Sequence, residues 1–388
     1  MKKVIFISAL AIAAAVSCTK SDIVDTKFDE QIGFENYLGR TAQTKAASVE
    51  ELAEVGLYGF YTGADVWNEA TSSNLWGNAR LYKNGTSWTY TPAKYWTNED
   101  DNYTFLAYAP YVAGASATSA EGQTTEELTK EYGDGSLTVN AGLKVADPTV
   151  TYTVPSALGN QQDVLYANVL NTSKRTATDG VKLQFHHALS RITVTAKDAV
   201  SNDDYTYNVY GVKINGDFVK TNTLNLATGN WETSEVYENR DYVFQQYTYT
   251  EKEKEGGVKI QVPANTPVSL DGDAHNFADN DNYLMVIPTN VTETPSVTDA
   301  TLTVTYTTIF DGKESTPMTK ELTISQTYLK GHAYAIALKF APNTDNVISF
   351  TVEVVGWDKT NETTPIVPEK PTTWPEDSQK DPSNPEAY

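Results

Sequence analysis

Apolar and polar residues alternate along much of the chain with a period of two. The pattern is unbroken in His332–Phe340, where Tyr, Ile, Leu and Phe occupy every second position, and Ile348–Val354 repeats it. Successive side chains of a strand point to opposite faces, so this period predicts strands with one buried face. Shorter stretches of the same kind predict strands at Gln31–Leu38, Asn102–Tyr108, Tyr205–Ile214, Val258–Val262, Tyr283–Ile287 and Leu302–Phe310.

The alternation changes phase inside the predicted strand region Val181–Ala196. Its apolar residues, together with His187, occupy odd positions from Leu183 to Leu189 and even positions from Ile192 to Ala196. A strand that continued in one register would turn its second half outward. We therefore predict a bulge or bend near Ala188–Arg191.

Turn signals separate the predicted strands. Asn215-Gly216 and Asp311-Gly312 are dipeptides that favour tight hairpin turns. Ala113–Gly135 is rich in small and acidic residues and predicts a surface loop, while helical periodicity is scarce and strongest in Ser48–Gly59. Many short strands with such punctuation predict an all-β protein built from β-sandwiches.

Composition supports this class and limits the partners. The 388 residues include 24 Tyr and 7 Trp, and aromatic and branched side chains favour strands. Asp and Glu total 50 against 29 Lys and Arg, so the formal net charge is −21. A field of this sign repels phosphates, so we expect neither nucleic acid nor anionic lipid headgroups as partners.

The first eighteen residues predict export. Lys2 and Lys3 precede the apolar run Val4–Val16, which is long enough for a signal peptide and too short to span a bilayer. A small residue precedes Cys18, the only cysteine, so we expect residues 1–17 to be a lipoprotein signal peptide and Cys18 to carry lipid. The alternative is that Cys18 is an ordinary residue of a secreted protein, since Ala15 stands where such signals usually have Leu.

Catalytic and metal-binding patterns are absent from the sequence. Of the four histidines, His186 and His187 are adjacent and would face opposite sides of a strand, so we expect one in the core and one in solvent. Asp271–Asp281 resembles a calcium loop but lacks its central glycine and final glutamate, which favours a solvated acidic loop. We therefore expect no enzyme activity, no cofactor and no metal.

Four tryptophans gather in one polar region, interleaved with tyrosines. On an exposed face they would stack on sugar rings or anchor a protein partner. The alternative is that they line the first core, because the same region has few aliphatic residues. The residues are Trp67, Trp76, Trp88 and Trp96.

Several segments resemble the fimbrillin-like family, the type V pilins of Gram-negative gut and oral bacteria. The resemblance covers most of the chain and implies two transthyretin-like, Greek-key β-sandwich domains in tandem. We expect them at residues 41–198 and 205–358, followed by a Pro-rich tail at 359–388. The matching segments, in family order, are Gln162–Ala167, Val181–Val194, Tyr283–Thr289, Leu329–Tyr334 and Val354–Trp357.

The resemblance also implies a maturation route. Members are exported as outer-membrane lipoproteins, and many are then cut after an Arg or Lys, which here would remove residues 18–40 with the first strand. Arg40 is the matching position and Lys45 the second candidate, the alternative being that Arg40 is an ordinary loop residue. The groove that opens is filled by a strand from another pilin subunit.

The tail departs from the pattern of shaft subunits. Asp358–Pro365 is polar, and prolines interrupt the few apolar residues that follow, Ile366, Val367 and Trp374. A donor strand needs alternating apolar residues and free N–H groups, so we expect a tip or accessory subunit of a fimbria at the cell surface, with a host protein or glycan as a candidate ligand. The alternative is a surface glycan-binding lipoprotein of a polysaccharide-uptake system.

Overall fold

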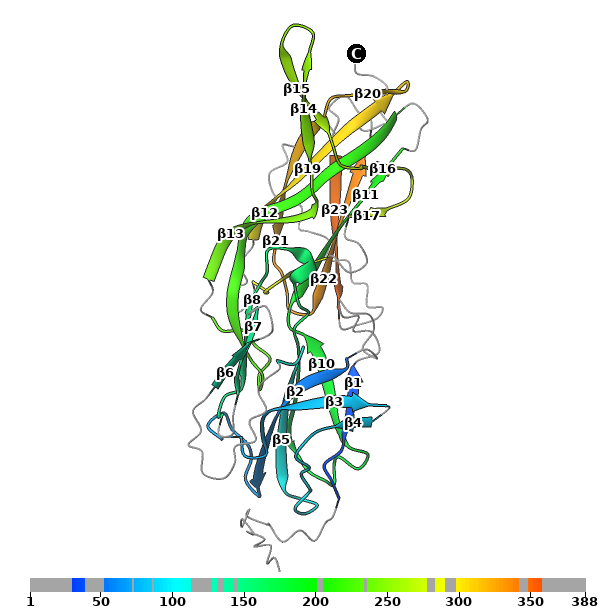
Figure 1. Cartoon of the computed structure of the whole chain (residues 1–388). Coiled ribbons are helices and arrows are strands. Elements are labelled where there is room, and N and C mark those ends of the chain that lie inside the picture. The colour runs from blue at the N-terminus through cyan, green and yellow to red at the C-terminus, as the bar shows by residue number, and fades with distance from the viewer. Residues whose placement is uncertain are drawn as a thin grey trace, which may run out of the picture.

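The computed structural model describes residues 30–38, 52–71, 73–85, 87–112, 128–131, 136–141, 145–200, 205–233, 236–277, 283–289, 298–341 and 348–357. Strands make up most of this part of the chain, and its helical content is one short 3-10 turn, Leu158–Asn160. The molecule is elongated, with the seven-stranded sheet at one end and the two larger sheets side by side towards the other (Figure 1). The predicted all-β class is confirmed.

One end of the molecule is a seven-stranded sheet. Its pairs are antiparallel, except that β1 runs parallel to β10. The sheet curls, so that β1 at one end of the order also lies near β4 at the other. The strands, in spatial order, are β1 (Phe34–Leu38), β10 (Val181–His187), β9 (Leu165–Thr172), β5 (Asn102–Ala109), β2 (Glu54–Gly63), β3 (Trp76–Asn84) and β4 (Ser87–Thr89).

The rest of the molecule contains two larger sheets. The five-stranded sheet has the order β17 (His275–Asn276), β11 (Ser190–Asp198), β22 (His332–Phe340) and β23 (Ile348–Gly356), with β18 (Leu284–Val286) also paired to β11. The nine-stranded sheet is centred on β12 (Tyr205–Asn225) and β19 (Thr298–Phe310). Its other strands are β6 (Leu128–Glu131), β7 (Leu137–Ala141), β8 (Thr149–Thr153), β13 (Val236–Gln245), β16 (Val268–Leu270), β20 (Lys313–Glu314) and β21 (Met318–Gln326).

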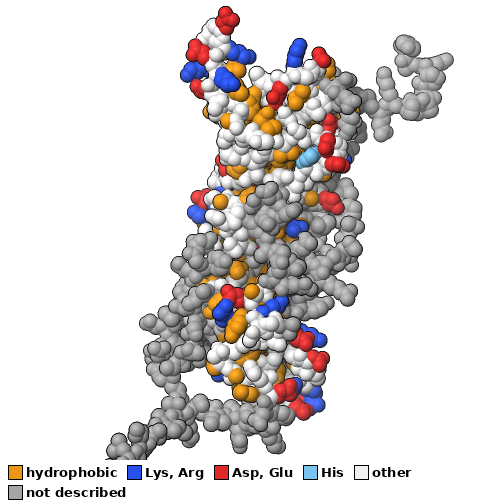
Figure 2. All heavy atoms as spheres, turned by 45° about the vertical axis from the view of Figure 1, so that its right-hand side comes forward, with side chains coloured by type: hydrophobic (Ala, Val, Ile, Leu, Met, Phe, Trp, Pro, Cys, Tyr) orange, Lys and Arg blue, Asp and Glu red, His pale blue; other side chains and the backbone are white. Residues whose placement is uncertain are grey.

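A separate hairpin projects beyond the far end of the molecule (Figure 1). It consists of β14 (Tyr249–Lys254) and β15 (Val258–Pro263), and every residue of β14 is exposed. Figure 2 shows that this hairpin carries side chains of both charges.

The sheets do not follow the predicted domain division. β8 precedes residue 198, yet it pairs with Thr221–Asn225 at the end of β12. Likewise β11, placed in the first domain by the sequence, pairs in parallel with β22. One buried apolar cluster contains Tyr58, Leu189 and Ile336, so the two halves of the chain share a core. The boundary at 198–205 stays a prediction, but hydrogen-bonded pairing crosses it.

The predicted bend near Ala188–Arg191 is a change of sheet. β10 ends at His187 in the seven-stranded sheet and β11 begins at Ser190 in the five-stranded sheet. Alternate residues are buried on both sides of the break, in opposite phase. The change of phase along the sequence therefore keeps both strands facing a core.

The two predicted hairpin turns have different outcomes. Asp311 and Gly312 join β19 to β20 with φ angles of 49° and 68°, as a tight hairpin requires. The turn at Asn215-Gly216 is wrong, because both residues lie inside β12. Gly216 faces Ala300, and a Cβ on Gly216 would lie only 3.1 Å from the Ala300 Cβ, so the glycine permits a close approach of two strands.

The other local predictions are mixed. The expected first strand is confirmed as β1, but the helical stretch Ser48–Gly59 is wrong from Glu54 onward, where β2 begins. β2 is buried on both faces from Val55 to Phe60, so its apolar run carries no period that separates helix from strand. The loop predicted at Ala113–Gly135 contains β6, and its remaining residues lie outside the described part.

A closely packed junction joins the seven-stranded sheet to the rest of the molecule. Gly229, in the loop after β12, has a φ of 68°, and a Cβ at this position would lie 2.1 Å from the Tyr166 ring of β9. The Lys330 ammonium bonds to the Gly229 carbonyl and lies 4.9 Å from the centre of the Tyr166 ring. The Trp231 indole N–H donates to the Ala188 carbonyl at 2.8 Å.

We predict that Gly229→Ala lowers the free energy of unfolding by about 2 to 4 kcal/mol, combining left-handed strain with a clash against Tyr166. Gly85→Ala is the matched control, because Gly85 has a φ of 67° but no atom within 4 Å of an added Cβ. The control should lose only the strain, about 1 kcal/mol. Denaturant unfolding measures both, and equal losses would contradict the packing at the junction.

Candidate functional site

The first described segment, residues 30–38, adds to the curled sheet between two neighbours. On one side β1 pairs with β10, from Phe34 opposite Val181 to Leu38 opposite Phe185. On the other side, the Ile32 amide donates to the Lys94 carbonyl at 2.9 Å, and the Trp96 amide donates to the Glu30 carbonyl at 3.1 Å. Backbone bonds on both sides therefore hold this segment in place.

Two side chains of the segment enter an aromatic core. Ile32 is fully buried and Phe34 is 7% exposed. The Phe34 ring meets three rings edge-on, with centroids at 5.9 Å to Trp76, 5.6 Å to Tyr90 and 5.3 Å to Phe105. Burial of a side chain of this size contributes about 1.5 to 3 kcal/mol, and edge-on aromatic pairs add to it.

Tyr90 ties this core to the backbone of the segment. Its hydroxyl donates to the Ile32 carbonyl at 2.6 Å. Burial raises the pKa of Tyr90 above its usual value, so the hydroxyl keeps its proton at physiological pH. The donor is therefore always available to the carbonyl.

The four tryptophans belong mostly to cores. Trp76 and Trp96 are 2% and 1% exposed and line the same aromatic core as Phe34, which is the alternative that the sequence left open. Trp88 is partly buried against that core, with the Lys83 ammonium 5.6 Å from the centre of its ring. Trp67 packs instead on Phe60 in the other core. Two of the four tryptophans proposed for glycan contact, Trp76 and Trp96, are therefore buried and cannot stack on a sugar in this structure.

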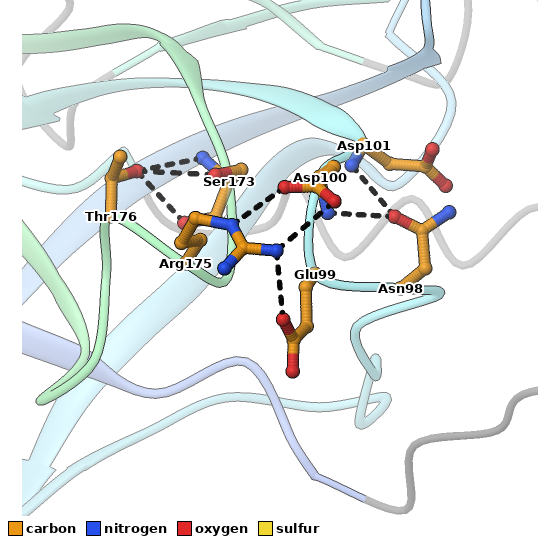
Figure 3. A network of polar contacts seen from close by, with 7 residues as sticks. All are labelled: Asn98, Glu99, Asp100, Asp101, Ser173, Arg175 and Thr176. Carbon is orange, nitrogen blue, oxygen red and sulfur yellow. Dashed lines mark hydrogen bonds and ion pairs between the residues drawn. The ribbon is translucent and has the colours of Figure 1, made fainter.

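A polar network closes the loops beside this core (Figure 3). The Arg175 side chain bridges Asp100, with Nε at 2.7 Å from Oδ1, and Glu99, with Nη2 at 3.0 Å from Oε2. Its hydrogen bond to Asp100 lowers the pKa of that carboxyl. Neighbouring Lys174 forms an ion pair with Glu30, directly before Gln31. No local sequence pattern indicates this network, because its partners are far apart along the chain.

The histidines behave as expected. His187 is fully buried, and His186 is partly exposed. The His187 Nδ1 atom lies 3.0 Å from the Asp163 carboxylate, a partner that sequence spacing did not suggest. In the acidic loop, His275 Nε2 lies 2.9 Å from the Asp271 carboxylate.

Within the described residues, no group of three or more His, Cys, Asp or Glu side chains is arranged to hold a metal ion. The same residues include no helix with the length and apolar character needed to cross a membrane. The lipidation residue Cys18, the processing candidates Arg40 and Lys45, and the tail from Asp358 onward lie outside the described part.

Comparison with known proteins identifies the family. Residues 42–357 match the model of the fimbrillin-like family. The chain belongs to the fimbrillin-like family. This fimbrillin-like protein is 23% identical over 385 residues to the fimbrium subunit Fim1C of Phocaeicola vulgatus, covering 90% of this chain and 94% of the relative. The predicted family is therefore confirmed, and the curated relative that it matches over most of its length is a fimbrium subunit.

Solved structures agree with the fold. A crystal structure of a fimbrial protein from Bacteroides vulgatus superposes with a TM-score of 0.62 at 19% identity, covering 85% of this fimbrillin-like chain and 100% of the other. The fimbrial anchor protein Mfa2 from Porphyromonas gingivalis matches 84% of this chain and 98% of its own, with a TM-score of 0.30 at 11% identity. The first similarity supports the fold alone, and the second is too low to carry an argument.

We predict that Phe34→Ala lowers the free energy of unfolding by about 3 to 5 kcal/mol, because it empties the centre of an aromatic cluster. Tyr90→Phe removes only the hydroxyl, which donates to the Ile32 carbonyl and more weakly to the Lys94 carbonyl, and should cost about 1 kcal/mol. Denaturant unfolding of the full chain measures both. A loss below about 0.5 kcal/mol for Phe34→Ala would mean that β1 is only a surface attachment.

Proposed function

We propose that this protein is exported as an outer-membrane lipoprotein and becomes a fimbrial subunit when cleavage after Arg40 removes the first strand. A strand from a neighbouring subunit then takes the vacated place. The observation that carries this proposal is the insertion of residues 30–38, with Ile32 just before β1 and Phe34 at its start, into a core built by other strands.

Removal of residues 30–38, which comprise β1 and the four residues before it, would leave two kinds of unsatisfied surface. β10 would lose its backbone partners from Val181 to Phe185, and Lys94 and Trp96 would lose theirs on the other side. The aromatic rings around Phe34 would face water. An added strand restores both the hydrogen bonds and the burial, so strand addition at this edge is favourable.

The burial pattern of residues 31–35 defines the sequence pattern that an incoming strand needs. Ile32 and Phe34 are buried, while Gln31, Gly33 and Glu35 between and beside them are exposed. The donor therefore needs two apolar side chains two positions apart, on a strand that pairs with β10. A Cβ at Gly33 would meet its nearest atom, the Gly180 Cα, at 4.0 Å, so the intervening position accepts a side chain.

This chain is better suited to accept such a strand than to donate one. Residues 358–388 contain six prolines. The few large aliphatic or indole side chains of this segment are Ile366, Val367 and Trp374. Proline cannot donate a ladder hydrogen bond. We therefore place the protein at the tip of a fimbria or among its accessory subunits.

We predict that surface-derived protein begins at Thr41 and that Arg40→Ala prevents this processing, while Lys45→Ala leaves it intact. N-terminal sequencing of protein released from cells measures the outcome. A mature chain that still begins at lipid-bearing Cys18 would contradict the maturation route. Arg175 should remain uncut, since carboxylates on two sides hold it in the folded state.

Truncation after Trp357 tests the position in the fimbria. Because the tail is a poor donor, we predict that fimbriae of normal length and number still form without residues 358–388. Electron microscopy with an antibody to this chain measures filament number and shows whether the label lies at a tip or along a shaft. Loss of filaments on truncation would show that the tail is a donor.

A further inference from the structure

β10 depends on β1 for most of its backbone pairing. Its first five residues, Val181–Phe185, pair with β1, whereas only His186 and His187 pair with β9. A cavity of about 220 Å³ lies where β9 and the start of β10 separate, lined in part by Val169, Thr172 and Lys182. The start of β10 therefore has β1 on one side and a cavity on the other.

The last residue of β10 holds the end of another strand. His187 stacks on the Trp357 indole with ring centroids 3.8 Å apart and planes inclined by 6°. Trp357 directly follows β23, is 4% exposed, and donates its amide to the Gly331 carbonyl at 2.6 Å. The Arg191 guanidinium lies 5.0 Å from the centre of the Trp357 ring and 5.0 Å from that of the Tyr283 ring, and these two rings meet edge-on.

We infer that β10 couples the occupancy of the β1 position to the anchoring of Trp357 at the end of β23. While β1 is in place, β10 is held along its length and His187 stays stacked on Trp357. When β1 leaves, the ladder of Val181–Phe185 is lost and the loosening of β10 reaches His187. The inference rests on the proposed function in taking the removal of β1 as the natural trigger.

The hydrogen bonds beyond β10 set the limit of this effect. The Ala188 amide donates to the Val164 carbonyl, and the Gly331 amide donates to the Leu189 carbonyl. The Trp231 indole also bonds to Ala188. The chain after His187 is thus fixed independently of β1. β23 pairs with β22 from Ile348 to Gly356, so the response should be confined to the end of β23 next to Trp357.

Hydrogen exchange on the full chain tests the coupling, with the Trp357 amide as reporter. In Phe34→Ala, which weakens the seating of β1, we expect exchange to become about tenfold faster both in Val181–His187 and at Val354–Trp357. Leu81→Ala is the matched control, because Leu81 is 1% exposed in the same core but lies on β3. It should leave Val354–Trp357 unchanged. Tyr90→Phe is the milder variant, with a smaller change in the same direction.

A second variant tests whether the effect reaches Trp357 through the His187 ring or through a general loss of stability. His187→Gln removes the stacked ring, so Val354–Trp357 should already exchange faster, and adding Phe34→Ala should produce no further change there. Faster exchange confined to Val181–His187 in Phe34→Ala would overturn the inference. Failure of cleavage after Arg40 would appear in N-terminal sequencing and would leave these exchange results as they are.

Discussion

The seating of Ile32 and Phe34 in an aromatic core is the interaction on which one end of this molecule depends. These side chains fill a space bounded by rings from β3, β5 and the segment after β4. The same segment supplies the backbone partners for β10 and for residues 94–96. A single short strand thus satisfies an apolar core and two exposed edges together. Any strand that replaces it must do both, which is a strict condition on its sequence.

The other constraint is the shared core between the two halves of the chain. β8 joins the sheet of β12, and Gly229 allows Tyr166 to pack against the loop that follows β12. Lys330 and Trp231 add hydrogen bonds across the same junction. Packed interfaces of this kind resist bending, because interiors are close-packed and every displacement loses contacts. A change at the β1 position can therefore reach the end of β23 through one strand without a hinge between domains.

Local sequence patterns predicted those elements whose cause is local. The alternation in β22 and β23 and the turn at Asp311-Gly312 depend on neighbouring residues alone, and all three are present. The turn prediction at Asn215-Gly216 was wrong because Gly216 makes room for Ala300 on the neighbouring strand. Ala300 lies 84 positions away along the chain and opposite Gly216 in the sheet. No local pattern identifies a partner at that distance.

In the candidate site, too, local features were predictable from the sequence and long-range contacts were not. The first strand was visible in the sequence, but its parallel pairing with β10 and its aromatic surroundings join segments distant in the chain. The tryptophans could be located but not assigned to core or surface, because their polar neighbours fit both. One histidine of the pair His186 and His187 was expected in a core, while the contacts of His187 with Asp163 and Trp357 emerged only from the fold.

β12 has a mechanical consequence. Its 21 residues span roughly 70 Å at about 3.3 Å per residue, from the far end of the molecule towards the middle (Figure 1). It pairs with β19 over one part of its length and with β8 at the end. Tension along the molecule loads these ladders in shear, so many hydrogen bonds share the load before any one breaks. The β14–β15 hairpin, by contrast, can peel open one pair at a time. Under flow across a cell surface, the β14–β15 hairpin would therefore open far more readily than the sheets that contain β12.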